Sequence, residues 1–97
     1  MFEIVFTEEA ERVFKSLKCD PSQVKRYKAV KKTIRFLAEN PRYNSLQTHE
    51  FLSLRGPGGE KVFEAYAEQN TPSAYRVFWY YGPDKGMITI ITITPHP

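Results

Sequence analysis

Arg76 is the residue whose type and position point most directly to chemistry. It stands in the middle of the apolar run "AYRVFWYY", where strand alternation places it on one face with Phe78 and Tyr80. A planar cation with five donors suits a phosphate group, and neighbouring aromatic rings suit a nucleobase. The alternative is a structural role, in which Arg76 pairs with Glu64 or Glu68 of the preceding strand or stacks on Tyr80.

His96 is the second candidate, because it directly follows the run "IITIT" and stands between two prolines. If this run and the strand of Arg76 form a hairpin, the end of one strand lies near the start of the other. His96 could then approach Arg76. Histidine is the natural proton donor or acceptor near neutral pH. The alternative is that His96 is an idle residue of the chain terminus.

Glu50 is the third candidate, since it interrupts the otherwise apolar start of the predicted strand "THEFLSLR". A carboxylate there can accept a proton from a substrate, or it can simply face solvent at the end of a strand. Glu64, in the following strand, is a rival for the role of proton acceptor.

The sequence predicts neither a cofactor nor a metal ion. Four potential metal ligands are present, but no pair has the spacing of a ligand motif: Cys19, His49, Glu50 and His96. The chain also has no glycine-rich phosphate loop after a strand and no serine or cysteine nucleophile signature.

Positive charge is concentrated in one short stretch of a chain whose formal net charge is +3. Six basic residues occur there without an intervening acid: Lys25, Arg26, Lys28, Lys31, Lys32 and Arg35. Helical spacing places four of them along one flank of a helix: Lys25, Lys28, Lys32 and Arg35. Such a flank suits an anionic partner, although it can also be a solvated helix face.

Two helices and five strands would position these side chains. "FEIVF" predicts a strand, and apolar residues at helical spacing predict a helix from Thr7 to about Cys19. A second helix begins near Asp20 and Pro21, ends at Asn40, and carries an apolar stripe: Val24, Tyr27, Val30, Ile34 and Leu37.

The rest of the chain predicts four strands separated by turns: "THEFLSLR", "EKVFEAYAE", "AYRVFWYY" and "MITIITIT". In the last strand the apolar phase shifts after Ile90, which indicates either a bulge or burial on both faces. The order β-α-α-β-β-β-β predicts an α+β fold in which two N-terminal helices pack on one face of a twisted, mainly antiparallel sheet.

The length of 97 residues corresponds to a single domain spanning residues 1–97. One cysteine cannot form an internal disulfide, which favours a reducing compartment. The N-terminus lacks the pattern of a secretory signal, and no apolar run has the length of a membrane span. We therefore expect a soluble cytoplasmic protein that does not associate with membranes.

With these features, the sequence resembles the RelE/ParE superfamily of toxins from bacterial toxin–antitoxin modules. The likeness covers almost the whole chain and rests on three segments: "FEIVFTEEAER", "TIRFLAENPRYNSLQTHEF" and "AYRVFWYYGPDKGMITIITIT". The final "HP" is similar to the YoeB branch, in which a histidine is followed by one aromatic residue; here that residue is Pro97. The RelE branch proper relies on lysines in the third strand, where this chain has Lys61 among glutamates.

The resemblance implies a metal-independent endoribonuclease that cuts mRNA on the ribosome. By position, Glu50 would be the general base, Arg76 would contact the scissile phosphate, and His96 would be the general acid. Eight residues are expected to bind substrate: Lys25, Lys28, Lys32, Arg35, Arg55, Lys61, Phe78 and Tyr80.

The resemblance also implies partners and leaves other functions open. A cognate antitoxin protein is expected, together with mRNA and ribosomal RNA, and a homodimer is compatible with the family. Because ParE-like members inhibit DNA gyrase without cutting RNA, the alternatives are a gyrase inhibitor and an inert antitoxin-binding protein.

Overall fold

The computed structural model describes residues 1–95, and these residues form two helices and five strands in the predicted order. In chain order the elements are β1 (Glu3–Phe6), α1 (Glu8–Cys19), α2 (Val24–Glu39), β2 (His49–Arg55), β3 (Lys61–Tyr66), β4 (Tyr75–Tyr81) and β5 (Met87–Pro95). Short 3-10 turns at Pro21–Gln23 and Asn44–Leu46 precede α2 and β2.

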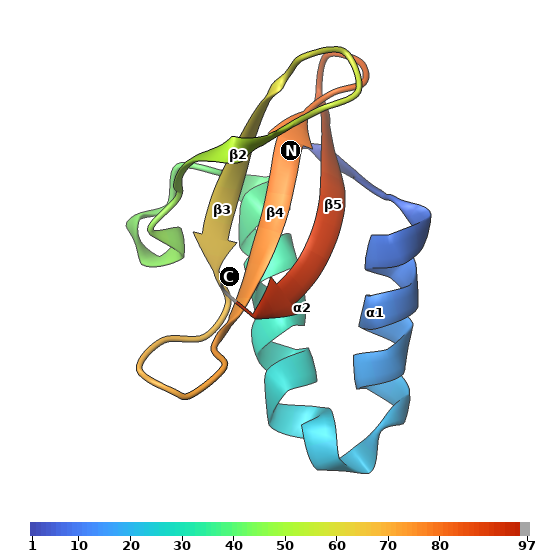
Figure 1. Cartoon of the computed structure of the whole chain (residues 1–97), viewed down its shortest axis with the longest axis vertical. Helices are drawn as coiled ribbons and strands as arrows, with labels where there is room; N and C mark the ends of the chain where they lie inside the picture. The colour runs from blue at the N-terminus through green and yellow to red at the C-terminus, as the bar shows by residue number, and fades with distance from the viewer. Residues whose placement is uncertain (96–97) are drawn as a thin grey trace.

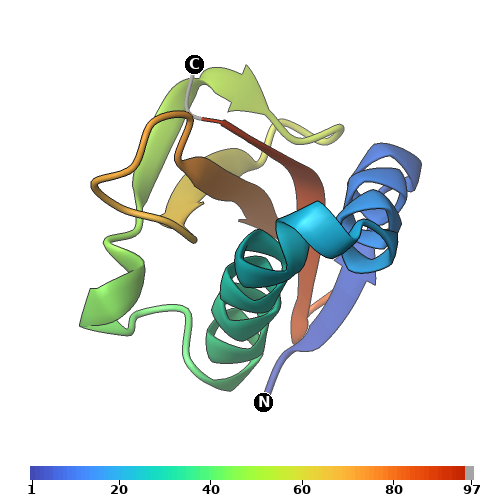
Figure 2. The ribbon, with the colours of Figure 1, turned by 90° about the horizontal axis from the view of Figure 1, so that it is seen from below.

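The five strands form one sheet in the order β1-β5-β4-β3-β2. Neighbouring strands are antiparallel except β1, which pairs in parallel with β5 at the edge of the sheet. Figure 1 shows α2 behind the strands and α1 to the right of β5, and the view from below shows the two helices side by side (Figure 2). The predicted α+β architecture is therefore confirmed. The sheet has an inner face against the helices and an outer face turned away from them.

The helices begin and pack largely as their sequences predict. The Thr7 side chain caps α1 by accepting a hydrogen bond of 3.1 Å from the backbone N–H of Ala10. Asp20 accepts hydrogen bonds from both the backbone and the hydroxyl of Ser22 before α2 begins. The prediction that Val24 is buried is wrong. This residue is 48% exposed, because the 3-10 turn delays the start of α2 until Val24 itself.

A bulge in β5 divides the apolar residues of the sheet between its two faces. Phe78 pairs with Thr92 but Trp79 pairs with Ile90, so Ile91 is an extra residue opposite β4. The main core lies on the inner face and includes Trp79 and Ile90. Ile91 instead packs with a second apolar cluster on the outer face. The phase shift in the sequence left a bulge or burial on both faces open, and the structure shows the bulge.

Candidate active site

Arg76 projects from β4 on the outer face, as strand alternation predicted. It pairs with Tyr66 of β3, and its guanidinium carbon lies 3.8 Å from the centre of the Tyr66 ring. Its Nη1 donates hydrogen bonds to the carbonyl oxygens of Glu68, at 2.8 Å, and Tyr75, at 3.4 Å. These contacts leave the side chain 11% exposed and hold the plane of the guanidinium in place.

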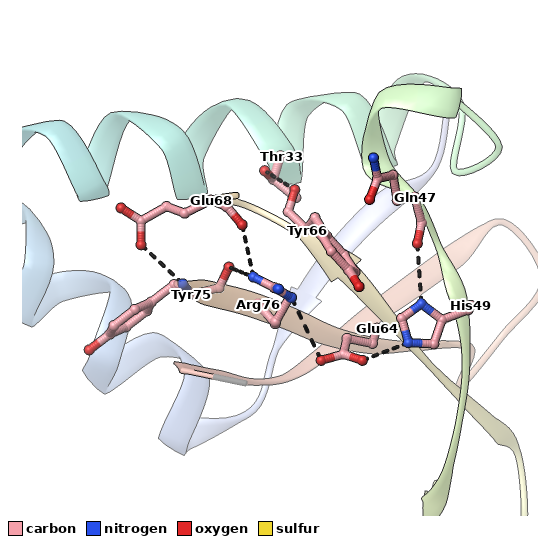
Figure 3. A network of polar contacts seen from close by, with 8 residues as sticks. All are labelled: Thr33, Gln47, His49, Glu64, Tyr66, Glu68, Tyr75 and Arg76. Atoms are coloured by element: carbon pink, nitrogen blue, oxygen red, sulfur yellow. Dashed lines mark hydrogen bonds and ion pairs between the residues drawn. The ribbon is translucent and has the colours of Figure 1, made fainter. Parts of the chain in front are cut away.

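Glu64 of β3 is fully buried and lies between two basic side chains. One carboxylate oxygen, Oε1, is 2.8 Å from Nε2 of His49, and Oε2 is 3.9 Å from Nε of Arg76 (Figure 3). Basic side chains on both oxygens offset part of the large free-energy cost of burying a carboxylate. The structure therefore joins Arg76 to the Glu64 side chain, as the structural alternative in the sequence had suggested.

His49 is the member of this cluster that sequence reasoning did not assign to catalysis. It is the first residue of β2 and pairs with Glu64 across the strands. Its Nδ1 is 3.2 Å from the carbonyl oxygen of Gln47, and its ring lies edge-on to that of Tyr66, with the centroids 5.8 Å apart. The side chain is 48% exposed, in contrast to Glu64. Its only signal in the sequence was its position at the start of a strand beside Glu50.

Glu50, the residue expected to be the base, is not brought to Arg76 by this arrangement. It pairs with Phe63, and directly paired residues project from the same face of a sheet. Phe63 packs against the inner core, so Glu50 projects away from the face that carries Arg76 and Glu64. The Glu50 carboxylate instead accepts a hydrogen bond of 3.2 Å from Nη1 of Arg55. Arg55 is thereby paired with an acid rather than poised for substrate.

His96 lies outside the described residues, so its expected approach to Arg76 stays a prediction. The hairpin on which that prediction depended is present. β4 and β5 are antiparallel, and Pro95, the last described residue, pairs with Tyr75, next to Arg76.

Two of the cations expected to bind substrate, Lys28 and Lys32, line a pocket of about 410 Å³ beside the cluster. Tyr66, the last residue of β3, and Gln69, which follows the strand, also line this pocket. Lys25 and Arg35 are exposed on the same helix, as a basic flank requires. Lys61 is also exposed, but it pairs with Arg55 at the far end of the β2–β3 hairpin.

Phe78 and Tyr80 do not offer their rings to a nucleobase, contrary to the prediction. They are only 2% and 6% exposed and form the second apolar cluster with Val62. Phe51 of β2 covers Phe78, with the ring centroids 4.9 Å apart. The prediction placed both residues on the correct face. There, however, Phe51 of β2 and the other residues of the second apolar cluster bury their rings.

This arrangement can stabilise a phosphate and exchange protons beside it. Arg76 supplies a fixed cation with several donors. His49 supplies a titratable ring on the other oxygen of the Glu64 carboxylate. Within residues 1–95, no group of three or more His, Cys, Asp or Glu side chains is arranged to hold a metal ion. No helix in the same range is both long enough and apolar enough to cross a membrane.

No family model and no curated protein matches this sequence. Solved structures do match its fold. A YoeB/ParE toxin from Agrobacterium tumefaciens superposes with a TM-score of 0.71 at 10% sequence identity, and the match covers 98% of this chain and 99% of the other. The YoeB dimer from Staphylococcus aureus gives a TM-score of 0.65 at 14% identity, with 99% and 98% covered.

Complexes of related toxins match as well. The archaeal RelE–RelB complex from Pyrococcus horikoshii contains a chain with a TM-score of 0.65 at 15% identity, covering 97% of this chain and 93% of the other. The E. coli RelBE toxin–antitoxin complex contains one with a TM-score of 0.61 at 18% identity, covering 100% and 99%. The chain thus has the same fold as these YoeB/ParE, YoeB and RelE toxins.

Proposed function

We propose that this protein is the toxin of a toxin–antitoxin module and that it acts as a metal-independent endoribonuclease on mRNA bound to the ribosome. The observation that carries the proposal is the cluster on the outer face of the sheet, where the buried carboxylate of Glu64 lies between Arg76 and His49. A fixed guanidinium beside a histidine and a carboxylate is a suitable site for cleaving a phosphodiester, and the fold is the one used by RelE and YoeB toxins.

The proposed reaction begins with attack of the ribose 2′-oxygen on the adjacent phosphorus atom. A 2′,3′-cyclic phosphate forms while the bond from phosphorus to the 5′ oxygen breaks. Arg76 would stabilise the negative charge that develops on the non-bridging oxygens. Because the ribose supplies the nucleophile, no metal-bound water is needed.

Glu64 replaces Glu50 as the proposed acceptor of the 2′-OH proton, because Glu64 shares the face of Arg76 and Glu50 does not. Arg76 lies beside Oε2 of Glu64, and it is also the group that would bind the phosphate. A shift of its guanidinium onto the phosphate would uncover Oε2, while His49 stays on Oε1. The role of His96 at the leaving oxygen stays a prediction from the sequence, because residue 96 lies outside the described residues.

Binding of the RNA would rest on the basic flank of α2. Lys28 and Lys32 border the pocket that leads to Tyr66, and Lys25 and Arg35 extend the same positive surface along the helix. Contacts between lysines and phosphates release counterions, so binding and cleavage should weaken as salt rises.

A cognate antitoxin is part of the proposal. Two of the matching solved structures are a RelE–RelB complex and the RelBE toxin–antitoxin complex, and another is a YoeB dimer. We expect this protein likewise to bind an antitoxin, to work in the cytoplasm where mRNA is translated, and to be capable of self-association.

The test is induced expression followed by mapping of cellular transcripts. Cleavage within translated mRNA is expected for the wild type and should be lost in Arg76→Ala, whereas Arg12→Ala, which removes an exposed arginine of α1, should cleave normally. Intact transcripts together with double-strand DNA breaks would overturn the nuclease reading in favour of gyrase inhibition. Normal growth with intact transcripts and intact DNA would favour an inert antitoxin-binding protein.

A further inference from the structure

Both ring nitrogens of His49 face oxygen atoms that can accept a proton. Nδ1 is 3.2 Å from the backbone carbonyl oxygen of Gln47, and Nε2 is 2.8 Å from Oε1 of Glu64. A carbonyl oxygen can only accept a hydrogen bond, so Nδ1 must carry a hydrogen to bond with it. The contact between Nε2 and Glu64 needs one further proton, which sits either on the ring or on the carboxyl group.

Arg76 lies on the other side of the same carboxylate. Its Nε is 3.9 Å from Oε2 of Glu64, the oxygen that does not contact His49. Nδ1 of His49 carries a hydrogen wherever the second proton sits, because its partner is a carbonyl oxygen. When Nε2 carries that second proton, loss of the hydrogen on Nδ1 leaves a neutral ring.

Exposure shows which end of the cluster a substrate can reach. Glu64 is fully buried, whereas the His49 side chain is 48% exposed. The hydrogen bond from Nδ1 to Gln47 is exposed, and at 3.2 Å it is longer than the contact between Nε2 and Glu64. A substrate oxygen can replace the Gln47 carbonyl on Nδ1 while Glu64 keeps hold of Nε2.

We propose that His49 is a catalytic residue, the general acid that protonates the departing 5′ oxygen of the RNA. The inference rests on the proposed ribonuclease function and assigns to His49 the role that the sequence had suggested for His96. The Nδ1 proton passes to the 5′ oxygen as the bond from that oxygen to phosphorus breaks, and His49 becomes neutral. Glu64 takes the proton of the 2′-OH. Solvent then returns a proton to His49 and removes one from Glu64.

Glu64 and Tyr66 explain why this histidine is suited to the role. The carboxylate fixes the ring through Nε2, while the edge contact with Tyr66 limits rotation of the ring. The arrangement places an acid and a phosphate-stabilising cation on the two oxygens of one carboxylate, so both are oriented by the same buried group.

The test compares two substrates that differ at the leaving atom. A ribosome-bound mRNA carries either the natural 5′ oxygen or a bridging 5′ sulfur at one cleavage position. A thiolate leaves without protonation, so an acid is needed only for the oxygen substrate. His49→Gln should cleave the oxygen substrate about 10²–10⁴-fold more slowly than the wild type, and the sulfur substrate within a few-fold of the wild-type rate.

The ratio of the two rates is measured in one preparation and therefore does not depend on the fraction of folded protein. Gln47→Asn is the matched control. It keeps the backbone carbonyl and suits the left-handed conformation of residue 47, at φ 47°, so its ratio should equal that of the wild type. His96→Gln should also leave the ratio unchanged.

Equal slowing of both substrates by His49→Gln, or no slowing of either, would overturn the assignment of His49 as the acid. Selective rescue by sulfur in His96→Gln would transfer the role to His96 and overturn it as well. If the wild type cleaves neither substrate nor natural mRNA, the ribonuclease function itself fails, and the inference fails with it.

Discussion

The outer face of the sheet has two ends that are built from the same strands but differ in chemistry. The polar end consists of His49, Glu64, Tyr66 and Arg76. The apolar end consists of Phe51, Val62, Phe78, Tyr80 and Ile91. Strand alternation placed Arg76, Phe78 and Tyr80 on the same face, yet only Arg76 belongs to a polar cluster. The difference shows that alternation determines on which face of the sheet a side chain lies. Side chains of the neighbouring strand determine whether that part of the face is buried and apolar or remains polar.

Phe78→Ala is expected to have the largest effect and to act on the apolar end alone. Phe78 is 2% exposed and packs against the ring of Phe51, so its truncation removes buried contacts and leaves a cavity. We expect a loss of about 3–5 kcal/mol in the free energy of unfolding, measured by urea denaturation. A loss below about 1 kcal/mol would show that the apolar end is not a second core.

Arg76→Lys tests the polar end, where we expect a large effect on cleavage and a small effect on stability. Lysine keeps the charge but loses the planar fork that is held over Tyr66, so cleavage should fall about 10²–10³-fold, as when one donor to a developing oxyanion is removed. The measurement is the single-turnover cleavage rate at saturating ribosome-bound mRNA. Stability should change less than in Phe78→Ala, and a reversed order of the two effects on stability would break the comparison.

Thr7→Ala removes a hydrogen bond between α1 and the apolar end, although Thr7 itself is not part of that end. The Thr7 hydroxyl caps α1 and donates a hydrogen bond of 2.6 Å to the carbonyl oxygen of Ile91, the residue of the bulge. We expect a loss of about 0.5–2 kcal/mol in unfolding free energy, with cleavage per folded molecule unchanged. Thermal unfolding and activity are measured on the same sample, and a fall in activity per folded molecule would show that the bulge also serves the polar end.

Asp20→Asn should have the smallest effect. It serves as a reference for the other three variants, because residue 20 belongs to neither end of the outer face. Hydrogen bonds from the Ser22 hydroxyl and then from its backbone N–H lower the pKa of the Asp20 carboxyl. The carboxylate therefore stabilises the fold above its pKa in the unfolded chain, and this contribution disappears as the pH falls through the lower pKa of the folded state. Melting temperatures across the acid range should depend slightly less on pH in the variant, and a steeper dependence would contradict this account.

The fold was predictable because its signals are local. Apolar spacing located both helices, turn residues located the strands, and a bulge was one of the two interpretations of the phase shift after Ile90. The parallel pairing of β1 with β5 had no such signal, since it joins the two ends of the sequence. Which strands become neighbours depends on the free energy of the whole sheet rather than on any one segment.

The site was only partly predictable for the same reason. The isolated charge of Arg76 in an apolar strand was visible in the sequence, and its pairing with Glu64 was an anticipated alternative. The register between β2 and β3 was not visible, and this register turns Glu50 to the inner face and brings His49 to Glu64. One residue of slip along β2 would exchange the two, which is why residue types alone favoured Glu50.

The position of β5 inside the sheet affects how the protein can fold while it is being synthesised. β5 is translated after the other four described strands, yet it lies between β1 and β4 and pairs with both. Until it emerges, β1 has no partner, and the strand that carries Arg76 has an open edge. Contacts that span nearly the whole chain, such as that of Thr7 with Ile91, form only after the ends have met. A protein proposed to act on ribosomes would therefore complete the sheet that carries its site only after β5 has emerged from the ribosome that made it.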